Sequence, residues 1–356
     1  MSKQNVSSRA AAAEGGAEVT IRDIARELSI SHTTVSRALA GHPHISVLTK
    51  ERVAQAVRRM GYLPNASARN MRGSPSSVVC LFVPDVQNDF YSTVAKLVAD
   101  QLANNAMQLM LAVTEDDPER EQRELRASLQ MRPAGVVIVP TAGPTPETRK
   151  MLKSTESVSL LRTHPGLTDD VVLVDDHAGT FAAADHLLGY GHRRLAYIGG
   201  GTDISTGKGR LEGFIDALKA RNLTPVDVAL GPPRPEFARH AVTAMMAQRN
   251  LPTALVLGSA ELTLGALQGL RAVGLEWPRD LSVVGYHDPP WFELVGTGIT
   301  TVRLPVRDLA LTATSVLLSR VKSSLKETGA EQRPAVMRFA PTLVLRGSTA
   351  PAKPDG

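Results

Sequence analysis

Two patterns of apolar and polar positions divide the chain near residue 75. Before residue 64, apolar residues recur with helical spacing, as at Ile21, Ile24, Ala25 and Leu28. From residue 78 onward, short apolar runs alternate with longer amphipathic stretches; the runs lie at 78–83, 109–113, 136–139, 171–174, 195–198, 254–257 and 282–286. Continuous apolar strands between amphipathic helices are typical of parallel sheets covered on both faces. Because about 270 residues of this pattern exceed one open sheet, we expect two α/β lobes.

The N-terminal helical region has the spacing of a helix-turn-helix. Thr20 is a candidate N-cap for the first helix, residues 29–31 form the turn, and a third helix is expected over residues 49–60. The second helix turns Val35, Ala38 and Leu39 inward and exposes His32, Thr33, Thr34, Ser36 and Arg37. A short polar face of this kind can enter the roughly 12 Å wide major groove of DNA. A small helical cap with a solvated polar face would give the same local pattern.

Positive charge is concentrated in the first fifth of the chain. Residues 1–73 hold 11 Lys and Arg against 5 Asp and Glu, whereas the whole chain has a net charge of +5. This asymmetry predicts a polyanionic partner for the N-terminal region and favours DNA binding over a solvated cap. Residues 1–18 lack the apolar run of a signal peptide, and we expect a disordered leader there.

The cysteine content and the apolar runs indicate where the protein works. Cys80 is the only cysteine, so an internal disulfide, a zinc finger and an iron–sulfur cluster are excluded. No apolar run approaches the roughly 18 residues that a membrane-spanning helix needs. These features predict a cytoplasmic protein with no membrane partner.

A series of motifs resembles the lactose/galactose repressor (LacI/GalR) family of bacterial transcription regulators. The N-terminal motifs are VTIRDIA at 19–25, TVSRAL at 34–39 and GYLPN at 61–65. The likeness continues in order through EDDPER at 115–120, LLGYGHRR at 187–194, IGG at 198–200, RLEGF at 210–214, SVVGY at 282–286, TTVR at 300–303 and LRGS at 345–348. The resemblance therefore extends over most of the chain.

The resemblance implies a specific domain organisation. A helix-turn-helix headpiece would occupy residues 19–63, a hinge helix and linker residues 64–75, and a disordered tail residues 349–356. Residues 76–348 would form a two-lobed α/β core, similar to periplasmic binding proteins, that binds a small effector and dimerises. The implied function is repression of transcription at a palindromic operator by a homodimer at the nucleoid, with no enzymatic activity, cofactor or metal.

The resemblance also assigns DNA contacts to individual positions. His32 and Thr33 fall where the family reads bases in the major groove; the other expected DNA-binding positions are Thr20, Ser31, Thr34, Ser36, Arg37, Asn65 and Ala68. Met71 stands where the family usually inserts a leucine into the central minor-groove step. Because the hinge is too short to be a stable helix alone in water, we expect it to fold when two protomers meet on an operator.

The effector cleft is where this chain departs from the family. His287 and Arg162 occupy two positions that are often acidic in sugar-binding relatives, whereas Arg210 is retained; the other expected effector residues are Phe90, Tyr91, Thr206 and Ser259. We expect the three basic groups to converge on one cleft with few opposing acids. Such a cleft requires negative charge from its ligand. The predicted effector is therefore an anionic carbohydrate, either a sugar acid or a sugar phosphate.

Other interpretations remain open at this point. The effector could be a neutral sugar, a purine or a partner protein, and Arg162 could lie outside the pocket with His287 as a neutral core residue. A cytoplasmic sugar-binding protein would share the core, but its N-terminal helices would be incidental and it would show no salt-dependent affinity for DNA. The glycines at 199–201 lack the third glycine of a dinucleotide fingerprint, and the His42–His44 segment is more typical of a turn than of a metal site.

Overall fold

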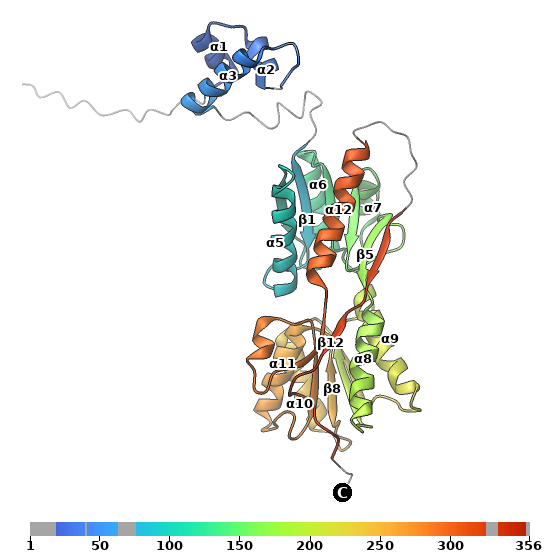
Figure 1. Ribbon diagram of the computed structural model, residues 1–356. Coiled ribbons are helices and arrows are strands. Elements are labelled where there is room, and N and C mark those ends of the chain that lie inside the picture. Colours follow the sequence, from blue (N-terminus) through green and yellow to red (C-terminus); the bar gives the residue numbers. More distant parts are fainter. Residues whose placement is uncertain (1–18, 40, 63–75, 325–333, 354–356) are drawn as a thin grey trace, which may run out of the picture. The chain divides into compact units, whose positions relative to one another are not determined.

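The computed structural model describes residues 19–39, 41–62, 76–324 and 334–353 (Figure 1). The chain divides into two units, Met1–Ser74 and Pro75–Gly356. The predicted leader and hinge, including Asn65, Ala68 and Met71, lie outside the described residues.

The described part of the first unit is a bundle of three helices with the predicted helix-turn-helix. Its helices are α1 (Ile21–Leu28), α2 (His32–Leu39) and α3 (Val47–Met60). Ile24 and Val35 are fully buried and form one apolar cluster with Val53 of α3. Ser29 ends α1 in the left-handed region, at φ 53°, so a polar residue occupies the conformation that glycine often supplies. This confirms the helix-turn-helix.

Two expectations for this bundle are corrected: where the third helix begins, and whether Leu39 is buried. Helix α3 begins two residues earlier than predicted, because Ser46 caps it: the Ser46 hydroxyl accepts a hydrogen bond from the backbone N–H of Thr49 at 3.2 Å. Leu39 was expected to face inward, but it is 36% exposed. Leu39 is the last residue of α2, so its side chain lies at the edge of the bundle and not in its core.

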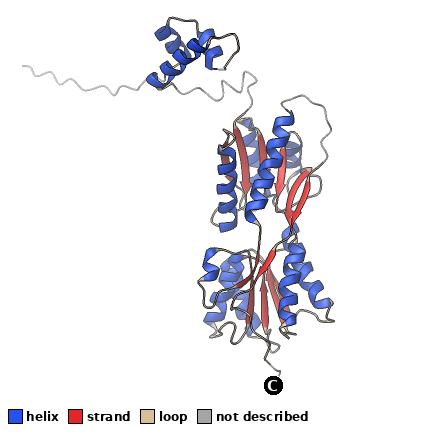
Figure 2. Cartoon of the chain, in the orientation of Figure 1, coloured by secondary structure: helices blue, strands red, loops and turns tan. Residues whose placement is uncertain are grey.

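The second unit contains two six-stranded sheets with helices on both faces, as the alternating pattern predicted (Figure 2). The first sheet has the order β11-β5-β4-β3-β1-β2, and the second has the order β12-β10-β9-β8-β6-β7. The strands of the first sheet are β1 (Val78–Val83), β2 (Gln108–Val113), β3 (Gly135–Ile138), β4 (Ser157–Leu160), β5 (Asp170–Val174) and β11 (Val336–Phe339). Those of the second are β6 (Leu195–Gly199), β7 (Asp227–Leu230), β8 (Ala254–Leu257), β9 (Ser282–Tyr286), β10 (Thr300–Arg303) and β12 (Thr342–Val344).

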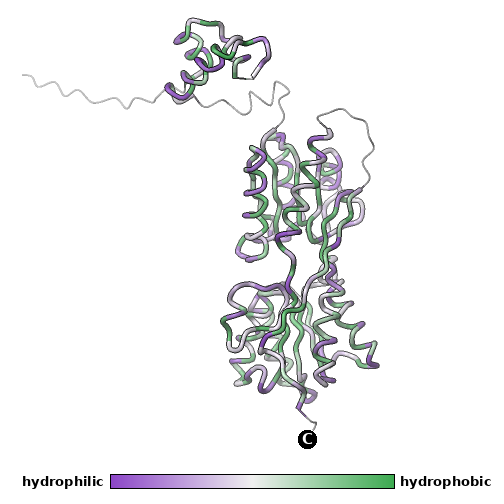
Figure 3. The backbone as a smooth tube through the Cα atoms, viewed as in Figure 1, coloured by the Kyte–Doolittle hydropathy of each residue, from purple (hydrophilic) through white to green (hydrophobic). Residues whose placement is uncertain are grey.

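The helices cover these sheets as two lobes. The first lobe carries α5 (Asp89–Ala103), α6 (Pro118–Gln130), α7 (Pro146–Lys153) and α12 (Val306–Ser324); the second carries α8 (Asp176–Gly189), α9 (Ser205–Lys219), α10 (Pro235–Met246) and α11 (Ala260–Ala272). A short 3-10 turn, η1 (Pro290–Glu293), precedes β10. Most strand residues of both lobes are buried and apolar, whereas the outer helix faces are polar (Figure 3). None of the helices in the described ranges is long and apolar enough to cross a membrane.

The chain passes between the lobes three times, after β5, after β10 and after β11. All strand pairs are parallel except β10 with β12, which is antiparallel. The three crossings mean that each lobe is built from more than one stretch of sequence. The carboxyl ends of the parallel strands therefore bring residues from distant parts of the chain together.

The C-terminal segment differs from the disordered tail expected from residue 349. The backbone N–H of Ala350 donates to the Ser282 hydroxyl at 3.1 Å, and that of Ala352 donates to the Tyr190 carbonyl at 2.8 Å. The buried imidazole of His192 contacts both the Ser282 hydroxyl and the Ala350 carbonyl at 3.0 Å. Residues 349–352 are thus bonded to the second lobe.

Candidate functional site

The exposed face of α2 is the candidate DNA-reading surface. Val35 and Ala38 anchor the helix in the headpiece core, which leaves His32, Thr33 and Arg37 exposed on the other side. Within the described residues, no carboxylate pairs with Arg37, so its guanidinium is available to a phosphate. This face presents two polar side chains and a cation on a rigid helix, as major-groove recognition requires.

Several hydroxyls expected to contact DNA already have local partners. The Ser31 hydroxyl caps α2, accepting from the Thr34 backbone N–H at 3.0 Å and contacting the Thr34 hydroxyl at 2.8 Å. The Thr20 hydroxyl donates to Asp23 at 2.6 Å. Thr34 and Ser36 are half-buried. These residues hold the ends and flank of the helices, while His32, Thr33 and Arg37 form the open part of the surface.

The second candidate site lies between the lobes of the core. Arg162 follows β4, Ser205 follows β6 and His287 directly follows β9, so the carboxyl ends of strands from both sheets supply its residues. Ligands of open parallel sheets bind at such ends. The lobes meet here, because the backbone N–H of Thr163 donates to the Ser205 hydroxyl at 3.1 Å. A cavity of about 230 Å³ lies beside this contact, lined by residues 141–142 and 162–165 of the first lobe and by residues 202–205 and Lys208 of the second.

Arg210 forms a largely buried ion pair with Asp176 in the second lobe. Its Nε donates to Asp176 at 2.7 Å, its Nη1 donates to the Gly258 carbonyl at 2.8 Å, and its guanidinium lies 4.1 Å from the Tyr286 ring centre. The Tyr286 hydroxyl also donates to Asp176, at 2.6 Å. Burial alone would lower the pKa of Arg210, but the charge of Asp176 raises it above its ordinary value. Arg210 is therefore a fixed, neutralised cation.

Arg162 has a carboxylate partner as well. It is 6% exposed and forms a two-pronged ion pair with Asp116, whose second contact, from Nη2, measures 3.3 Å. Nη1 also donates to the Pro140 carbonyl at 3.3 Å. Asp116 and Leu161, the residue before Arg162, adopt left-handed backbone conformations at φ 56° and 64°. Such backbone is strained for residues other than glycine and clusters at functional sites.

His287 reaches from the second lobe to the first. Its Nε2 lies 3.4 Å from Asp89, and its ring meets Phe90 edge to face at 5.5 Å. Burial lowers the pKa of His287, with the Asp89 contact opposing this, so the imidazole is neutral at pH 7. Nδ1 is buried and has no hydrogen-bond partner among the described residues. A buried ring nitrogen without a partner is a candidate for a ligand hydrogen bond.

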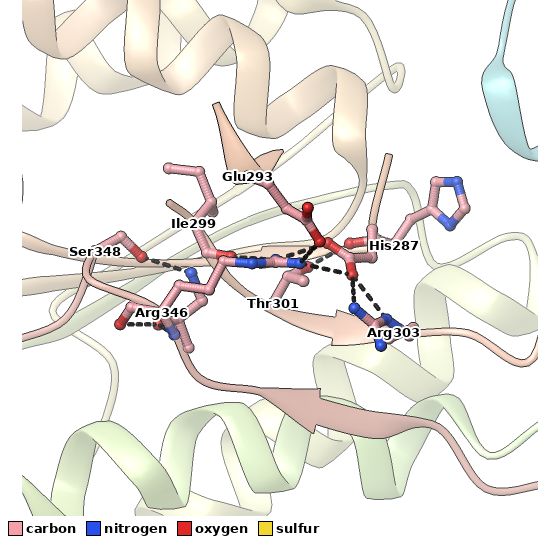
Figure 4. Close-up of polar contacts among 9 residues, drawn as sticks. His287, Glu293, Ile299, Thr301, Arg303, Arg346 and Ser348 are labelled. Atoms are coloured by element: carbon pink, nitrogen blue, oxygen red, sulfur yellow. Dashed lines mark hydrogen bonds and ion pairs between the residues drawn. The ribbon is translucent and has the colours of Figure 1, made fainter. Parts of the chain in front are cut away.

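An ion network holds the backbone behind His287 (Figure 4). Asp288 is contacted by Arg303 Nε at 2.7 Å and by Arg346 Nη1 at 2.7 Å, and Arg346 also pairs with Glu293 at 3.0 Å. The backbone N–H of His287 donates to the Val302 carbonyl at 2.9 Å. The imidazole points away from the network, so the network fixes the main chain and leaves the ring facing the first lobe.

These contacts overturn the expectation of a basic cleft with few opposing acids. Asp116, Asp176 and Asp89 each face one of the three expected basic groups. Asp116 lies 46 residues from Arg162 and Asp89 lies 198 residues from His287, so local sequence patterns do not indicate these pairs. The only signal is position: Asp116 and Asp89 belong to loops or helix starts that follow strand ends, and Asp176 begins the helix after β5.

The remaining expected effector residues have mixed placements. Tyr91 is close enough to Arg162 and Arg210 for both charges to act on its hydroxyl, while burial raises the pKa of that group. Phe90 is buried at the start of α5. The Ser259 hydroxyl accepts from the backbone N–H of Leu262 at 3.1 Å and so caps α11. Thr206 is 5% exposed in the first turn of α9, where its neighbour Ser205 makes the contact between lobes.

A buried carboxyl group that the sequence did not single out lies behind this cleft. Glu121 of α6 is fully buried, and its Oε2 accepts from the backbone N–H of Thr141 at 2.8 Å. Burial raises the pKa of Glu121 from 4.5 to about 7, against the opposing effect of that hydrogen bond. The native state therefore binds this proton more tightly than the unfolded state does.

This group predicts a stability change with pH. The stabilising proton is fully present below pH 4.5 and is lost as the pH rises through about 7. In Glu121→Gln the amide oxygen can keep the Thr141 bond without titrating, so we expect the stability of the variant relative to the unmodified protein to rise by about 2–3 kcal/mol between pH 5 and pH 8. Urea unfolding at both pH values measures this. The same difference at both pH values would contradict a raised pKa.

Comparisons with known proteins match both the N-terminal helices and the two-lobed core. Residues 20–65 match the model for bacterial regulatory proteins of the lacI family, and residues 184–349 match the model for a periplasmic binding protein-like domain. The HTH-type transcriptional regulator DegA of Bacillus subtilis is 28% identical over 347 residues, which cover 94% of this chain and 99% of that relative.

Two solved structures extend this agreement. The lac repressor dimer bound to operator and an anti-inducer has a TM-score of 0.80 at 21% identity and covers 94% of this chain and 100% of its own. The complex of the transcriptional regulator CelR with cellobiose has a TM-score of 0.69 at 25% identity and covers 93% of this chain and 99% of its own. With its helix-turn-helix and its two-lobed core, the chain belongs to the lacI family of bacterial regulatory proteins, which are DNA-binding transcription regulators and not enzymes.

Proposed function

We propose that the protein is a homodimeric cytoplasmic repressor whose affinity for a palindromic operator is set by a small molecule bound between the lobes of the core. The observation that carries this is the coexistence, in one chain, of an open cationic reading helix and a separate interlobe cleft with an unpartnered polar atom. Related regulators support both halves: one is solved as a dimer on its operator, another with cellobiose. Two headpieces related by twofold symmetry fit two half-sites.

A ligand in this cleft would act by changing the relation between the lobes. Contacts such as Thr163 with Ser205 and His287 with Asp89 join the lobes at two places, and a bound molecule would add to or replace such contacts. A ligand shifts an equilibrium only by its different affinity for two states. A coupling of about 1–3 kcal/mol is typical and would change operator affinity by about 5- to 150-fold.

We propose that the effector is a sugar derivative. At the end of the cleft near Arg210 and His287, Arg210 is paired with Asp176 and the His287 imidazole is neutral, so no ligand charge is needed here. Paired carboxylates and an unpartnered imidazole nitrogen suit hydroxyl groups, which both donate and accept. We therefore propose that the sugar ring lies at this end of the cleft.

Base reading by α2 is tested by substitution. His32→Ala and Thr33→Ala should each change which base is preferred at one operator position, by about 1–3 kcal/mol, because both side chains are exposed on the reading face. Operator selection from random DNA, followed by affinity measurement at single-base variants, tests this. The matched control is His44→Ala, which removes an exposed imidazole of the same headpiece outside α2. Unchanged base preferences in both α2 variants would contradict the proposal.

A further inference from the structure

The 230 Å³ cavity between the lobes has a lining that suits an anion. Arg162 and Lys208 line it from opposite lobes together with the imidazole of His164, and Asp203 is the one carboxylate among its lining residues. Arg162 is 6% exposed and is held by Asp116, which does not line the cavity. The nearest carboxylate partner of Lys208 within the described residues is Glu212, at 3.9 Å. Positive charge therefore exceeds negative charge on the cavity wall.

The start of α9 adds donors to the same wall. Its N-cap is Ile204, which has no side-chain acceptor, so no side chain caps the first N–H groups of this 15-residue helix. Gly207 in this first turn packs against the preceding loop so closely that a Cβ would lie 2.0 Å from the Gly201 carbonyl oxygen. The turn is thus fixed with its amide groups beside Ser205 and Lys208. Helix N-termini of this kind bind anions through both N–H groups and dipole.

An unpartnered buried hydroxyl lies in the opposite wall. Thr141 is 3% exposed and lines the cavity, and its Oγ1 lies beside the buried Glu121 carboxyl but makes no hydrogen bond of normal geometry among the described residues. Native proteins leave few buried polar atoms unpaired without a ligand, water or functional reason. The Thr141 hydroxyl is an observation independent of the helix terminus.

We infer that this cavity is a phosphate subsite, and that the effector is a phosphorylated sugar whose phosphate is held by Arg162, Lys208, Thr141 and the first turn of α9. The donors outnumber the two oxygens of a carboxylate, whereas a phosphate has three oxygens to receive them. This inference rests on the proposed function, because it places one group of the effector within the same cleft. The sugar ring then extends toward Arg210 and His287.

Inorganic phosphate tests the subsite without knowledge of the whole effector. In the full chain, phosphate should raise the melting temperature in a saturable manner at constant ionic strength, and acetate should do so less. Lys208→Met should weaken phosphate binding about tenfold, because it removes a charge-assisted hydrogen bond. The matched control is Lys219→Met, at the other end of α9, where the lysine is 68% exposed and pairs with Asp216. Equal phosphate binding by the two variants would overturn the subsite.

Matched ligands separate this inference from the proposed function. A panel of sugars and their phosphates is added to the protein on its selected operator, and operator affinity is measured. We expect a phosphorylated member to change that affinity at least tenfold more effectively than its neutral partner, and Lys208→Met to remove this difference. If the neutral sugar acts equally well, the phosphate subsite fails and the effector-controlled repressor stands. If specific operator binding itself is absent, the proposed function fails whatever phosphate does.

Discussion

Raising the salt concentration from 50 to 200 mM should weaken operator binding by about 10³- to 10⁵-fold. Residues 1–73 carry 11 Lys and Arg against 5 Asp and Glu, and Arg37 is exposed without an acidic partner among the described residues. If the two headpieces neutralise about 6–10 phosphates, the release of counterions gives log affinity a slope of about −5 to −9 against log salt. Fluorescence anisotropy of a labelled operator across a KCl series measures that slope.

Two variants show whether the slope originates in the headpiece. Arg37→Ala should make it shallower by about 2 in a dimer, since each protomer loses one phosphate contact, and should weaken different operators to a similar extent. Lys219→Ala also removes one positive charge, but it lies in the core on α9 and should leave the slope unchanged. An affinity that does not vary with salt would contradict a basic DNA-binding headpiece.

Much of this fold follows from local sequence patterns because local physics determines it. The apolar spacing around Ile24 and Val35 defines the headpiece, and the buried central strands appear as continuous apolar runs. The strands that the pattern misses are the edge strands β7, β11 and β12, whose residues are half-buried or exposed, and the central strands β4 and β10, whose buried residues include Ser159, Thr300 and Thr301. An edge strand has one open side, so its sequence carries a weaker apolar signal.

The sequence indicated which segments contribute to the candidate cleft, but the predicted excess of basic groups in it was wrong. Arg162 and His287 do follow strand ends, and Arg162 lines the cavity, whereas Arg210 lies in the second turn of α9. Their partners depend on how loops fold back: Asp116 turns toward Arg162 through left-handed backbone, and His287 itself lies at φ 70°. Sequence alone states which residues reach the cleft, but a pairing across tens of residues depends on the tertiary fold. For this reason three cations were expected, whereas the structure has two ion pairs and one neutral imidazole.

Arg210→Ala should lower the free energy of unfolding by about 3–5 kcal/mol. From the sequence, Arg210 was expected to bind the effector. In the structure, however, the arginine is 16% exposed and its partner Asp176 is 8% exposed, so truncation leaves a buried carboxylate without its cation. Breaking a buried pair on one side costs this much because the remaining charge is uncompensated. Urea unfolding at pH 7 measures the loss.

The double variant distinguishes the effect of an unpaired buried charge from simple loss of packing. Asp176→Asn combined with Arg210→Ala removes both charges, so we expect it to recover about 1–3 kcal/mol relative to the sum of the two single losses. The matched control is Arg221→Ala, whose partner Asp185 is 48% exposed; an exposed pair of this kind contributes about 0–1 kcal/mol. If Arg210→Ala lowers the free energy of unfolding no more than Arg221→Ala does, the buried pair does not stabilise the second lobe. In that case Arg210 would be free to bind a ligand charge, as the sequence first suggested.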